Sequence, residues 1–194
     1  MRCLSCEKLS FKAICNKCQK NLLEPSFYKR ELEKDFFVYS FYKFDEIKEL
    51  LNSKYHFYGD RVFKILGDLA FKKFALNFEY PDRVFALPID DRVKENFSHT
   101  ALLAKSLQSK NIQPLFTTLQ ARNSVKYAGK PLEFRKKNKR DFLYNGEKKL
   151  EVILVDDIIT TGTTILEAKK VLKKSGCKVL FALTLSDVPI EKTL

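Results

Sequence analysis

Short apolar runs and longer amphipathic stretches follow one another along the chain, which predicts an α/β protein. The apolar runs have the β-branched and aromatic composition of strands, and the region 36–42 is expected to form one strand or a hairpin. Further strands are predicted at 83–87, 114–119, 151–155 and 178–185. Helices are predicted at 45–53, 60–78, 98–110 and 163–175, with Asp60 and Ser98 as N-caps of the second and third. From Pro81 onward strands and helices alternate, as in a parallel sheet covered on both faces.

This alternation is interrupted between Leu119 and Leu150, where no periodicity is visible. A stretch of about thirty residues without a regular pattern is typical of a functional flap. Within it, residues 126–140 carry one acid, Glu133, among seven cations: Lys126, Lys130, Arg135, Lys136, Lys137, Lys139 and Arg140. Aromatic residues are interleaved with them, and charge with flat rings favours single-stranded nucleic acid. The same cations would also suit a flap that closes over a diphosphate, or a solvated lysine-rich loop.

The composition supports an anionic partner. The chain of 194 residues carries 36 Lys and Arg against 24 Asp and Glu, a net charge of +12. This excess favours nucleic acid or phosphate-bearing ligands, although an AT-rich genome also raises the lysine content. The sequence has no apolar run of membrane-spanning length, and its first residues lack a signal-peptide core. We therefore expect a cytoplasmic protein that reaches the inner membrane only through partners.

Four of the five cysteines form a metal-binding pattern. Cys3, Cys6, Cys15 and Cys18 have the spacing C-x2-C-x8-C-x2-C, in which two tight knuckles present four thiolates to one ion. Zinc suits four sulfur ligands, and a segment this short would fold only around its ion. Two disulfides are disfavoured in a reducing cytosol, and no thioredoxin-like unit surrounds the cysteines to make a redox pair. We predict a zinc-binding knuckle at 1–24 and a separate domain at 25–194, in which Cys177 is a small buried residue.

The most informative stretch is 152–164, Val-Ile-Leu-Val-Asp-Asp-Ile-Ile-Thr-Thr-Gly-Thr-Thr. An apolar strand delivers Asp156 and Asp157 at its carboxyl end, where ligands bind in open α/β sheets. The backbone N–H groups of 160–164 and the following helix N-terminus can surround a phosphate, and Gly162 permits its close approach. The carboxylates can accept hydrogen bonds from a vicinal diol or reach Mg²⁺ through water. A ribose 5-phosphate has both features, whereas the plainer alternative is a strand–turn–helix with a capping side chain.

This stretch closely resembles the phosphoribosyl-diphosphate loop of type I phosphoribosyltransferases. With the four-cysteine pattern and the length, the chain resembles the ComF family, the ComFC type linked to bacterial natural transformation. The resemblance implies a type I phosphoribosyltransferase-like parallel sheet with helices on both faces, plus a small N-terminal zinc knuckle. It implies that Asp156 and Asp157 hold the ribose hydroxyls and magnesium. The 5-phosphate would be held by Thr160, Thr161, Gly162, Thr163 and Thr164.

Other parts of the resemblance are looser. The strand that ends at Pro88 matches the position of the family's pyrophosphate-side loop. Residues 94–99 stand where relatives carry an Arg-Gly-Phe-Asn-Gln-like run, of which Phe97 is kept, and Arg135 and Asn138 match a spaced Arg and Asn.

Three further polar residues follow the strand that ends at Pro88. Asp90 and Asp91 follow that strand and suit magnesium placement or, more simply, a turn after proline. His99 is interpreted as a surface or capping residue without a catalytic role.

The resemblance implies a function in DNA uptake, with single-stranded DNA bound by the basic flap and an ATP-driven ComFA-type translocase as partner. The alternative is an active phosphoribosyltransferase, in which magnesium neutralises the leaving diphosphate. Its acceptor is not evident, because the nine residues after Leu185 are too few for a base-binding hood. A nucleotide-responsive regulator is the third possibility, but the chain lacks a DNA-reading helix pair.

Overall fold

The computed structural model describes residues 1–93, 97–123 and 140–189. The predicted nucleic-acid residues Lys126, Lys130, Arg135, Lys136, Lys137 and Lys139 lie outside these ranges, as do Asn138 and residues 94–96. Only Arg140 of that basic set is described.

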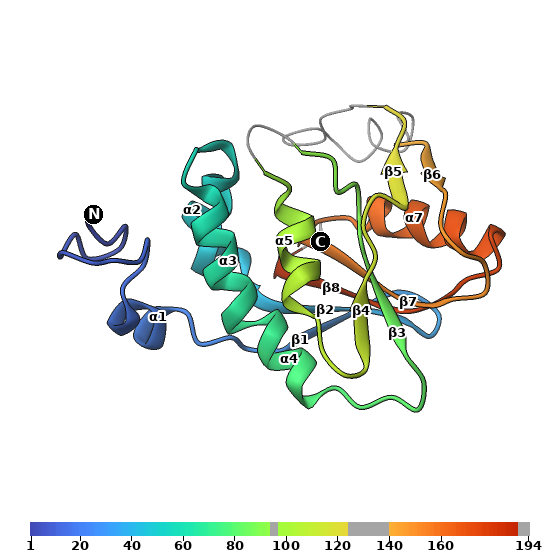
Figure 1. The fold of residues 1–194 in the computed structure, drawn as a ribbon, viewed down its shortest axis with the longest axis horizontal. Helices are drawn as coiled ribbons and strands as arrows, with labels where there is room; N and C mark the ends of the chain where they lie inside the picture. Colours follow the sequence, from blue (N-terminus) through green and yellow to red (C-terminus); the bar gives the residue numbers. More distant parts are fainter. Residues whose placement is uncertain (94–96, 124–139, 190–194) are drawn as a thin grey trace, which may run out of the picture.

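A six-stranded sheet in the order β1-β2-β8-β7-β3-β4 forms the centre of the molecule (Figure 1). The edge strand β1 is antiparallel to β2, and all the other neighbours in this sheet are parallel. Its strands are β1 (Tyr28–Glu33), β2 (Phe36–Lys43), β3 (Val84–Pro88), β4 (Ile112–Pro114), β7 (Glu151–Ile159) and β8 (Lys178–Asp187). A second, two-stranded antiparallel sheet consists of β5 (Leu119–Ala121) and β6 (Phe142–Tyr144).

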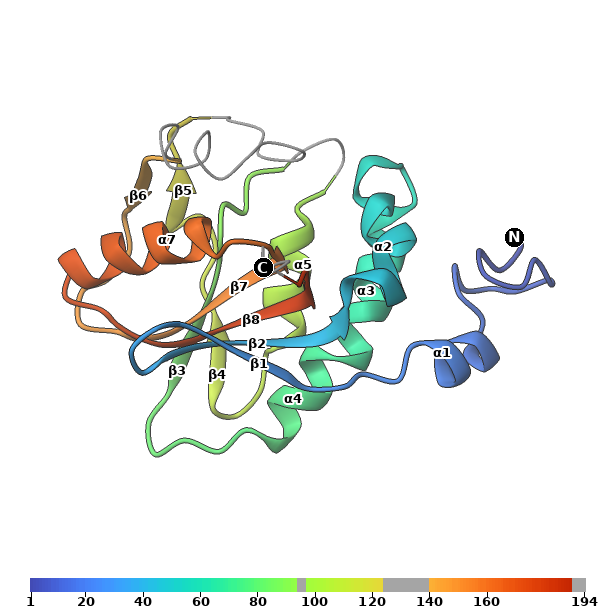
Figure 2. The ribbon, with the colours of Figure 1, turned by 180° about the vertical axis from the view of Figure 1, so that it is seen from behind.

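Helices cover both faces of the large sheet, as Figures 1 and 2 show from opposite sides. The helices are α1 (Asn16–Leu22), α2 (Phe44–Asn52), the 3-10 turn η1 (Ser53–Tyr55), α3 (Gly59–Leu69), α4 (Phe71–Asn77), α5 (His99–Ser106) and α7 (Thr163–Lys174). One apolar core lies between the sheet and α2–α5, and a second lies between the sheet, α7 and the small β5–β6 sheet.

The central strand β7 shows why the sheet is parallel and buried. Ile153 and Val155 belong to the core beneath α2–α5, whereas Val152 and Leu154 belong to the core beneath α7. All four side chains are fully buried, so this strand is apolar on both faces. A continuous apolar run of this kind is the signature of a parallel strand with helices on either side. The predicted fold class is therefore confirmed.

Two element predictions are wrong in detail. The helix expected over 60–78 is two helices, which meet at Ala70, and its N-cap is Tyr58 rather than Asp60. Ala70 is buried together with Leu66 and Phe71. The helix is therefore interrupted by tertiary packing, at a position where the sequence has neither glycine nor proline. The strand expected at 114–119 is also wrong: β4 ends at Pro114, and the chain turns through Thr117 (φ 59°) before β5 begins.

The N-terminal segment lies at the end of the molecule opposite α7 (Figures 1 and 2). Its buried residues Cys3 and Ile14 join the same apolar core as α2 and α3. The hydroxyl group of Tyr42 in β2 donates a hydrogen bond of 3.0 Å to the carbonyl of Leu23. The division into 1–24 and 25–194 stays a prediction. Among the described helices, none has the length and apolar character needed to cross a bilayer.

Candidate functional site

The loop predicted to hold a phosphate lies at the carboxyl end of β7, at the centre of the sheet. β7 is longer than expected and runs to Ile159, so that Asp156 and Asp157 belong to the strand itself. The extension is held by pairing with β8, where Asp156 lies opposite Thr184 and Ile158 opposite Ser186. Residues 160–162 then turn directly into α7.

A small hollow is formed at this turn. Its polar lining comes from Asp156, Thr160, Thr161, Thr163 and Thr164, together with the backbone of Gly162. No side chain caps the N-terminus of α7, and the hydroxyl groups of Thr161 and Thr163 lie 2.9 Å apart. An uncapped helix N-terminus surrounded by hydroxyl donors has the chemistry of an anion site, because the first-turn N–H groups point out of the helix. The plainer interpretation, a strand–turn–helix with a side-chain cap, is wrong for this helix.

Backbone conformation favours glycine at position 162, and a neighbouring side chain crowds the space that a larger residue would need. The backbone of Gly162 lies in the left-handed region at φ 77°, which side chains with a Cβ rarely adopt. A Cβ added there would lie 2.6 Å from Cδ1 of Leu32, a residue of β1. The edge strand therefore packs directly against the turn.

Arg30 is a second contact from β1 that the sequence did not reveal. Its guanidinium donates hydrogen bonds to the carbonyl of Thr160, to the carboxylate of Asp187 and, at 2.6 Å, to the carbonyl of Val188. It thus joins the end of β7 to the end of β8. In the sequence, Tyr28 and Leu32 stand at alternate positions with Arg30 between them, and this period of two matches the half-buried face of β1.

Asp157 is buried against two basic side chains, Lys54 and His99, whose contacts with it the sequence did not reveal. Lys54 of η1 donates a hydrogen bond of 2.8 Å to Oδ2 of Asp157, and Nε2 of His99 lies 3.6 Å from the same oxygen. Burial alone would raise the pKa of Asp157, but the charges of Lys54 and His99 lower this pKa below its usual value. Burial likewise opposes the charge of Lys54, yet Asp157 raises the pKa of Lys54 to about 12.

His99 therefore differs from its predicted surface or capping role. It is the first residue of α5, faces Asp157, and contacts the ring of Phe63 edge-on with centroids 5.6 Å apart. The cap of α5 is Ser98, as predicted, whose hydroxyl accepts a hydrogen bond from the N–H of Ala101.

Asp156 has a different environment from its neighbour. It lines the hollow, whereas Asp157 does not. Burial raises the pKa of Asp156 well above its usual value, and the negative charge of Asp157 raises it further. The two acids thus do not act as an equivalent pair: Asp156 faces the hollow, and Asp157 faces Lys54 and His99.

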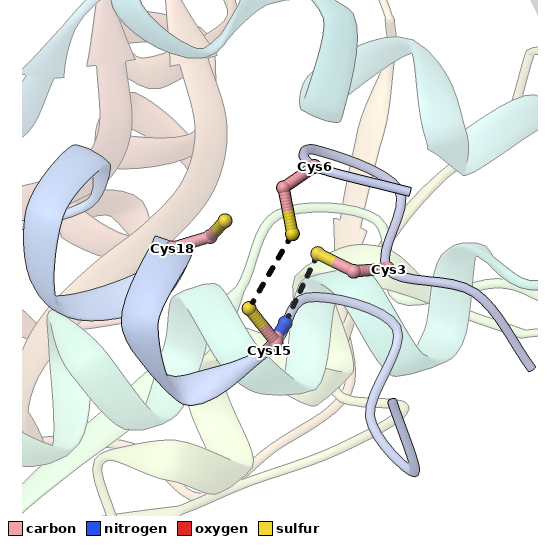
Figure 3. Close-up of side chains that lie close together, drawn as sticks. All are labelled: Cys3, Cys6, Cys15 and Cys18. Atoms are coloured by element: carbon pink, nitrogen blue, oxygen red, sulfur yellow. Dashed lines mark hydrogen bonds between the residues drawn. The ribbon is translucent and has the colours of Figure 1, made fainter. Parts of the chain in front are cut away.

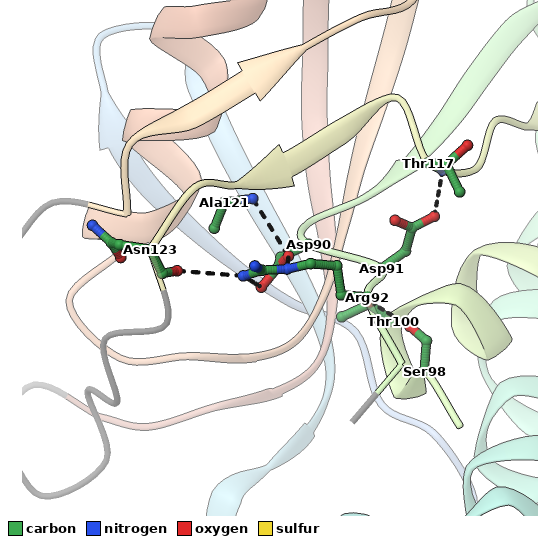
Figure 4. A network of polar contacts seen from close by, with 8 residues as sticks. All are labelled: Asp90, Asp91, Arg92, Ser98, Thr100, Thr117, Ala121 and Asn123. Atoms are coloured by element: carbon green, nitrogen blue, oxygen red, sulfur yellow. Dashed lines mark hydrogen bonds and ion pairs between the residues drawn. The ribbon is translucent and has the colours of Figure 1, made fainter. Parts of the chain in front are cut away.

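Asp90 and Asp91 form the turn expected after Pro88 (Figure 4). Asp90 adopts φ 58° and accepts hydrogen bonds from Arg92 at both carboxylate oxygens. Oδ2 of Asp91 accepts a hydrogen bond of 2.6 Å from the N–H of Thr117. Asp90 also accepts one from the N–H of Ala121, so Asp91 fastens the loop before β5, and Asp90 fastens β5 itself, to the end of β3.

The four predicted metal ligands converge (Figure 3). The Sγ atoms of Cys3, Cys6, Cys15 and Cys18 all lie within 4.8 Å of one another, and those of Cys6 and Cys15 are 3.8 Å apart. Four sulfurs at about 2.3 Å from one tetrahedral ion are separated by about 3.8 Å, so this cluster could hold a metal such as zinc. The N–H of Cys15 donates to Sγ of Cys3 and, despite burial, lowers the pKa of Cys3 to about 6. The thiolate form of Cys3 is therefore favoured. For Cys18, a hydrogen bond to Ser5 lowers the pKa, but burial and hydrogen bonds to the other thiols outweigh it and, in the absence of a metal, raise this pKa to about 11.

Two other sequence expectations concern single residues. Cys177 is buried as predicted and lies outside the four-cysteine cluster. Arg140, the only described member of the basic set, donates its backbone N–H to Oε2 of Glu167 in α7 at 3.0 Å.

Comparison with known proteins agrees with this geometry. Residues 110–193, which include the loop, match the family model described as the phosphoribosyl transferase domain. The chain has a phosphoribosyltransferase-like fold. No curated protein sequence matches it.

Several solved structures are similar at low identity. A hypoxanthine phosphoribosyltransferase from Staphylococcus aureus is 14% identical over 66% of this chain, with a TM-score of 0.41, and this chain spans 64% of its length. A phosphoribosyltransferase from Corynebacterium diphtheriae is 18% identical over 88% of this chain and 81% of that one, with a TM-score of 0.42. An orotate phosphoribosyltransferase from Mycobacterium tuberculosis is 16% identical over 88% and 82%, also with a TM-score of 0.42.

Cys15→Ser is expected to abolish stoichiometric metal binding, because one of four convergent thiolates is replaced by a weak ligand. Elemental analysis of the purified protein measures this directly. Cys177→Ser, which removes a buried thiol outside the cluster, is the control and should retain the metal. Full metal occupancy in Cys15→Ser would contradict the four-cysteine site.

Gly162→Ala should destabilise the protein by more than the ~1–2 kcal/mol that a left-handed alanine costs, because the new methyl group also meets Leu32. Gly176→Ala is a matched control: its φ is 80°, but an added Cβ meets nothing closer than 3.9 Å. Urea unfolding gives both free energies. Equal losses of unfolding free energy in the two variants would show that the contact between Leu32 of β1 and the turn does not affect stability.

Lys54→Met should reduce the free energy of unfolding by about 3 kcal/mol, because it leaves the buried Asp157 carboxylate without its closest cation. The double variant Lys54→Met/Asp157→Asn should recover part of this loss, since the orphaned charge is then gone. A double variant less stable than Lys54→Met in urea unfolding would contradict a stabilising ion pair.

Proposed function

We propose that this protein binds a phosphoribosyl diphosphate-type ligand with magnesium and works as a ComF-type protein in natural transformation, where it handles single-stranded DNA. The observation that carries the ligand part is the hollow at the start of α7, where Asp156 lies beside hydroxyl groups and an uncapped helix N-terminus. An anion at the helix N-terminus and a diol at the carboxylate fit a ribose 5-phosphate.

The loop contains two kinds of residue, neutral hydrogen-bond donors and carboxylates, for which we propose different ligands. Thr160, Thr161, Gly162, Thr163 and Thr164 would bind the 5-phosphate, since they supply neutral donors around one point. Asp156 would accept from the ribose hydroxyls and would be the ligand-side carboxylate for Mg²⁺, a cation that prefers oxygen ligands. Asp157, which we predicted as an equal partner, would instead hold the geometry through Lys54 and His99.

The convergence of the four cysteines supports a structural role for a bound metal. Zinc held by Cys3, Cys6, Cys15 and Cys18 would supply the folding energy of the N-terminal segment, whose apolar residues are few. Because Cys3 and Ile14 contact the core of the main sheet, the metal would also stabilise the surroundings of α2 and α3.

The DNA part of the proposal depends on charge. A net charge of +12 attracts polyanions, and the resemblance to ComF proteins supplies DNA uptake as the context and a ComFA-type translocase as partner. Binding to single strands should weaken steeply with salt. A labelled oligonucleotide that does not bind at low salt would contradict this part alone.

Calorimetric titration with phosphoribosyl diphosphate and Mg²⁺ tests the ligand part. Wild-type protein should bind, and Asp156→Asn should bind at least tenfold more weakly, because an amide is a poorer acceptor for hydroxyl groups and a poorer magnesium ligand. Asp68→Asn, an exposed acid on α3, is the control with the same chemical change. Equal affinities for all three proteins would overturn the site, and turnover with added nucleobases would favour the alternative, an active phosphoribosyltransferase.

A further inference from the structure

An open groove lies along α7, and its lining also includes Glu33 at the end of β1 and Asp141 and Phe142 beside the small sheet. It has a volume of about 840 Å³. Its lining includes Thr163 at the start of the helix and Lys174 at its end, a length of about 18 Å at 1.5 Å per residue. One end of the groove is therefore next to the hollow at the phosphate loop, because Thr163 lines both.

The groove is lined by lysines in two successive helical turns. Lys169 and Lys170 lie one turn before Lys173 and Lys174, so that all four reach the same side of the molecule. Lys169 is bound to Glu33 at 2.7 Å and lies over the ring of Phe36. Lys170, Lys173 and Lys174 are exposed, and across the described parts of the chain none of these three pairs with an acid.

The acids of the groove are already engaged by the protein. Glu33 pairs with Lys169, and Asp141 pairs with Arg122 at 2.9 Å. Glu167 accepts a hydrogen bond from the backbone of Arg140. Glu33 and Asp141 are thus neutralised by cations, whereas Glu167 has only a backbone donor, so the groove keeps an excess of positive charge on its three exposed lysines.

The groove offers few specific contacts besides charge. Its apolar floor consists of Leu166, Val171 and Phe142, and the ring of Phe142 is only 6% exposed. A ligand here meets aliphatic surface and mobile ammonium groups, which bind phosphates as point charges rather than reading base edges.

We propose that the groove along α7 binds the phosphodiester backbone of single-stranded nucleic acid without sequence preference. The proposal rests on the single-strand binding proposed above and specifies a site for it on described residues. It also accounts for the composition of α7, which carries four lysines and one acid, whereas α2 carries one lysine and three acids.

The test compares two variants with the same loss of charge. The groove variant is Lys170→Gln/Lys173→Gln/Lys174→Gln, and the control is Lys48→Gln/Lys64→Gln/Lys72→Gln, which changes exposed lysines on α2, α3 and α4. Fluorescence anisotropy with a labelled oligothymidylate, repeated over a series of salt concentrations, gives the slope of log K against log salt. Each phosphate contact of a single strand contributes about 0.7 to this slope.

The groove variant should lose about 2 from the magnitude of the slope, since three contacts are removed. The control should keep nearly the wild-type slope. Circular dichroism and retained binding of phosphoribosyl diphosphate would show that the groove variant is folded. A wild-type slope in the groove variant, or equal losses in both variants, would overturn the site, whereas wild-type protein that binds no oligothymidylate would overturn single-strand binding as a whole.

Discussion

A carboxylate inside a strand that is buried on both faces must have a partner, and much of this structure follows from how Asp157 obtains one. Burying an unpaired charge costs several kcal/mol, so the strand tolerates Asp157 only because a cation reaches it. That cation, Lys54, comes from the short turn η1 between α2 and α3, more than a hundred residues earlier in the chain. The N-terminal helices are thereby tied to the centre of the sheet by charge as well as by apolar packing.

The ion pair also makes two neighbouring acids different. With Asp157 engaged by Lys54 and His99, Asp156 is the carboxylate that faces the hollow. A carboxyl group beside an uncapped helix N-terminus is a mixed environment, which suits a ligand with an anionic end and a hydroxylated body. Such a ligand can hydrogen-bond both to the N–H and hydroxyl donors of the turn and to the carboxyl group of Asp156, whereas a plain anion would use only the donors.

The sequence predicted the elements whose signal is local. The apolar run of β7, the Ser98 cap and the cysteine spacing each depend on residues close in the chain, and all three match the structure. It did not predict Lys54, Arg30 or the role of His99, because each acts on a residue far away in the chain. The break at Ala70 was missed for the same reason, since the packing of α3 and α4 overrides a continuous helical pattern.

The antiparallel edge strand β1 shows how such distant contacts determine how far the chain can be shortened without loss of the phosphate loop. A shortened chain beginning at Phe36 would keep every parallel pairing of the sheet, because β1 contributes only the antiparallel one. It would nevertheless lose Arg30, the donor to the Thr160 carbonyl, and Leu32, the side chain that packs against Gly162. The outermost strand thus supports the turn at the centre of the sheet. A minimal domain must therefore include β1 as well as the parallel strands.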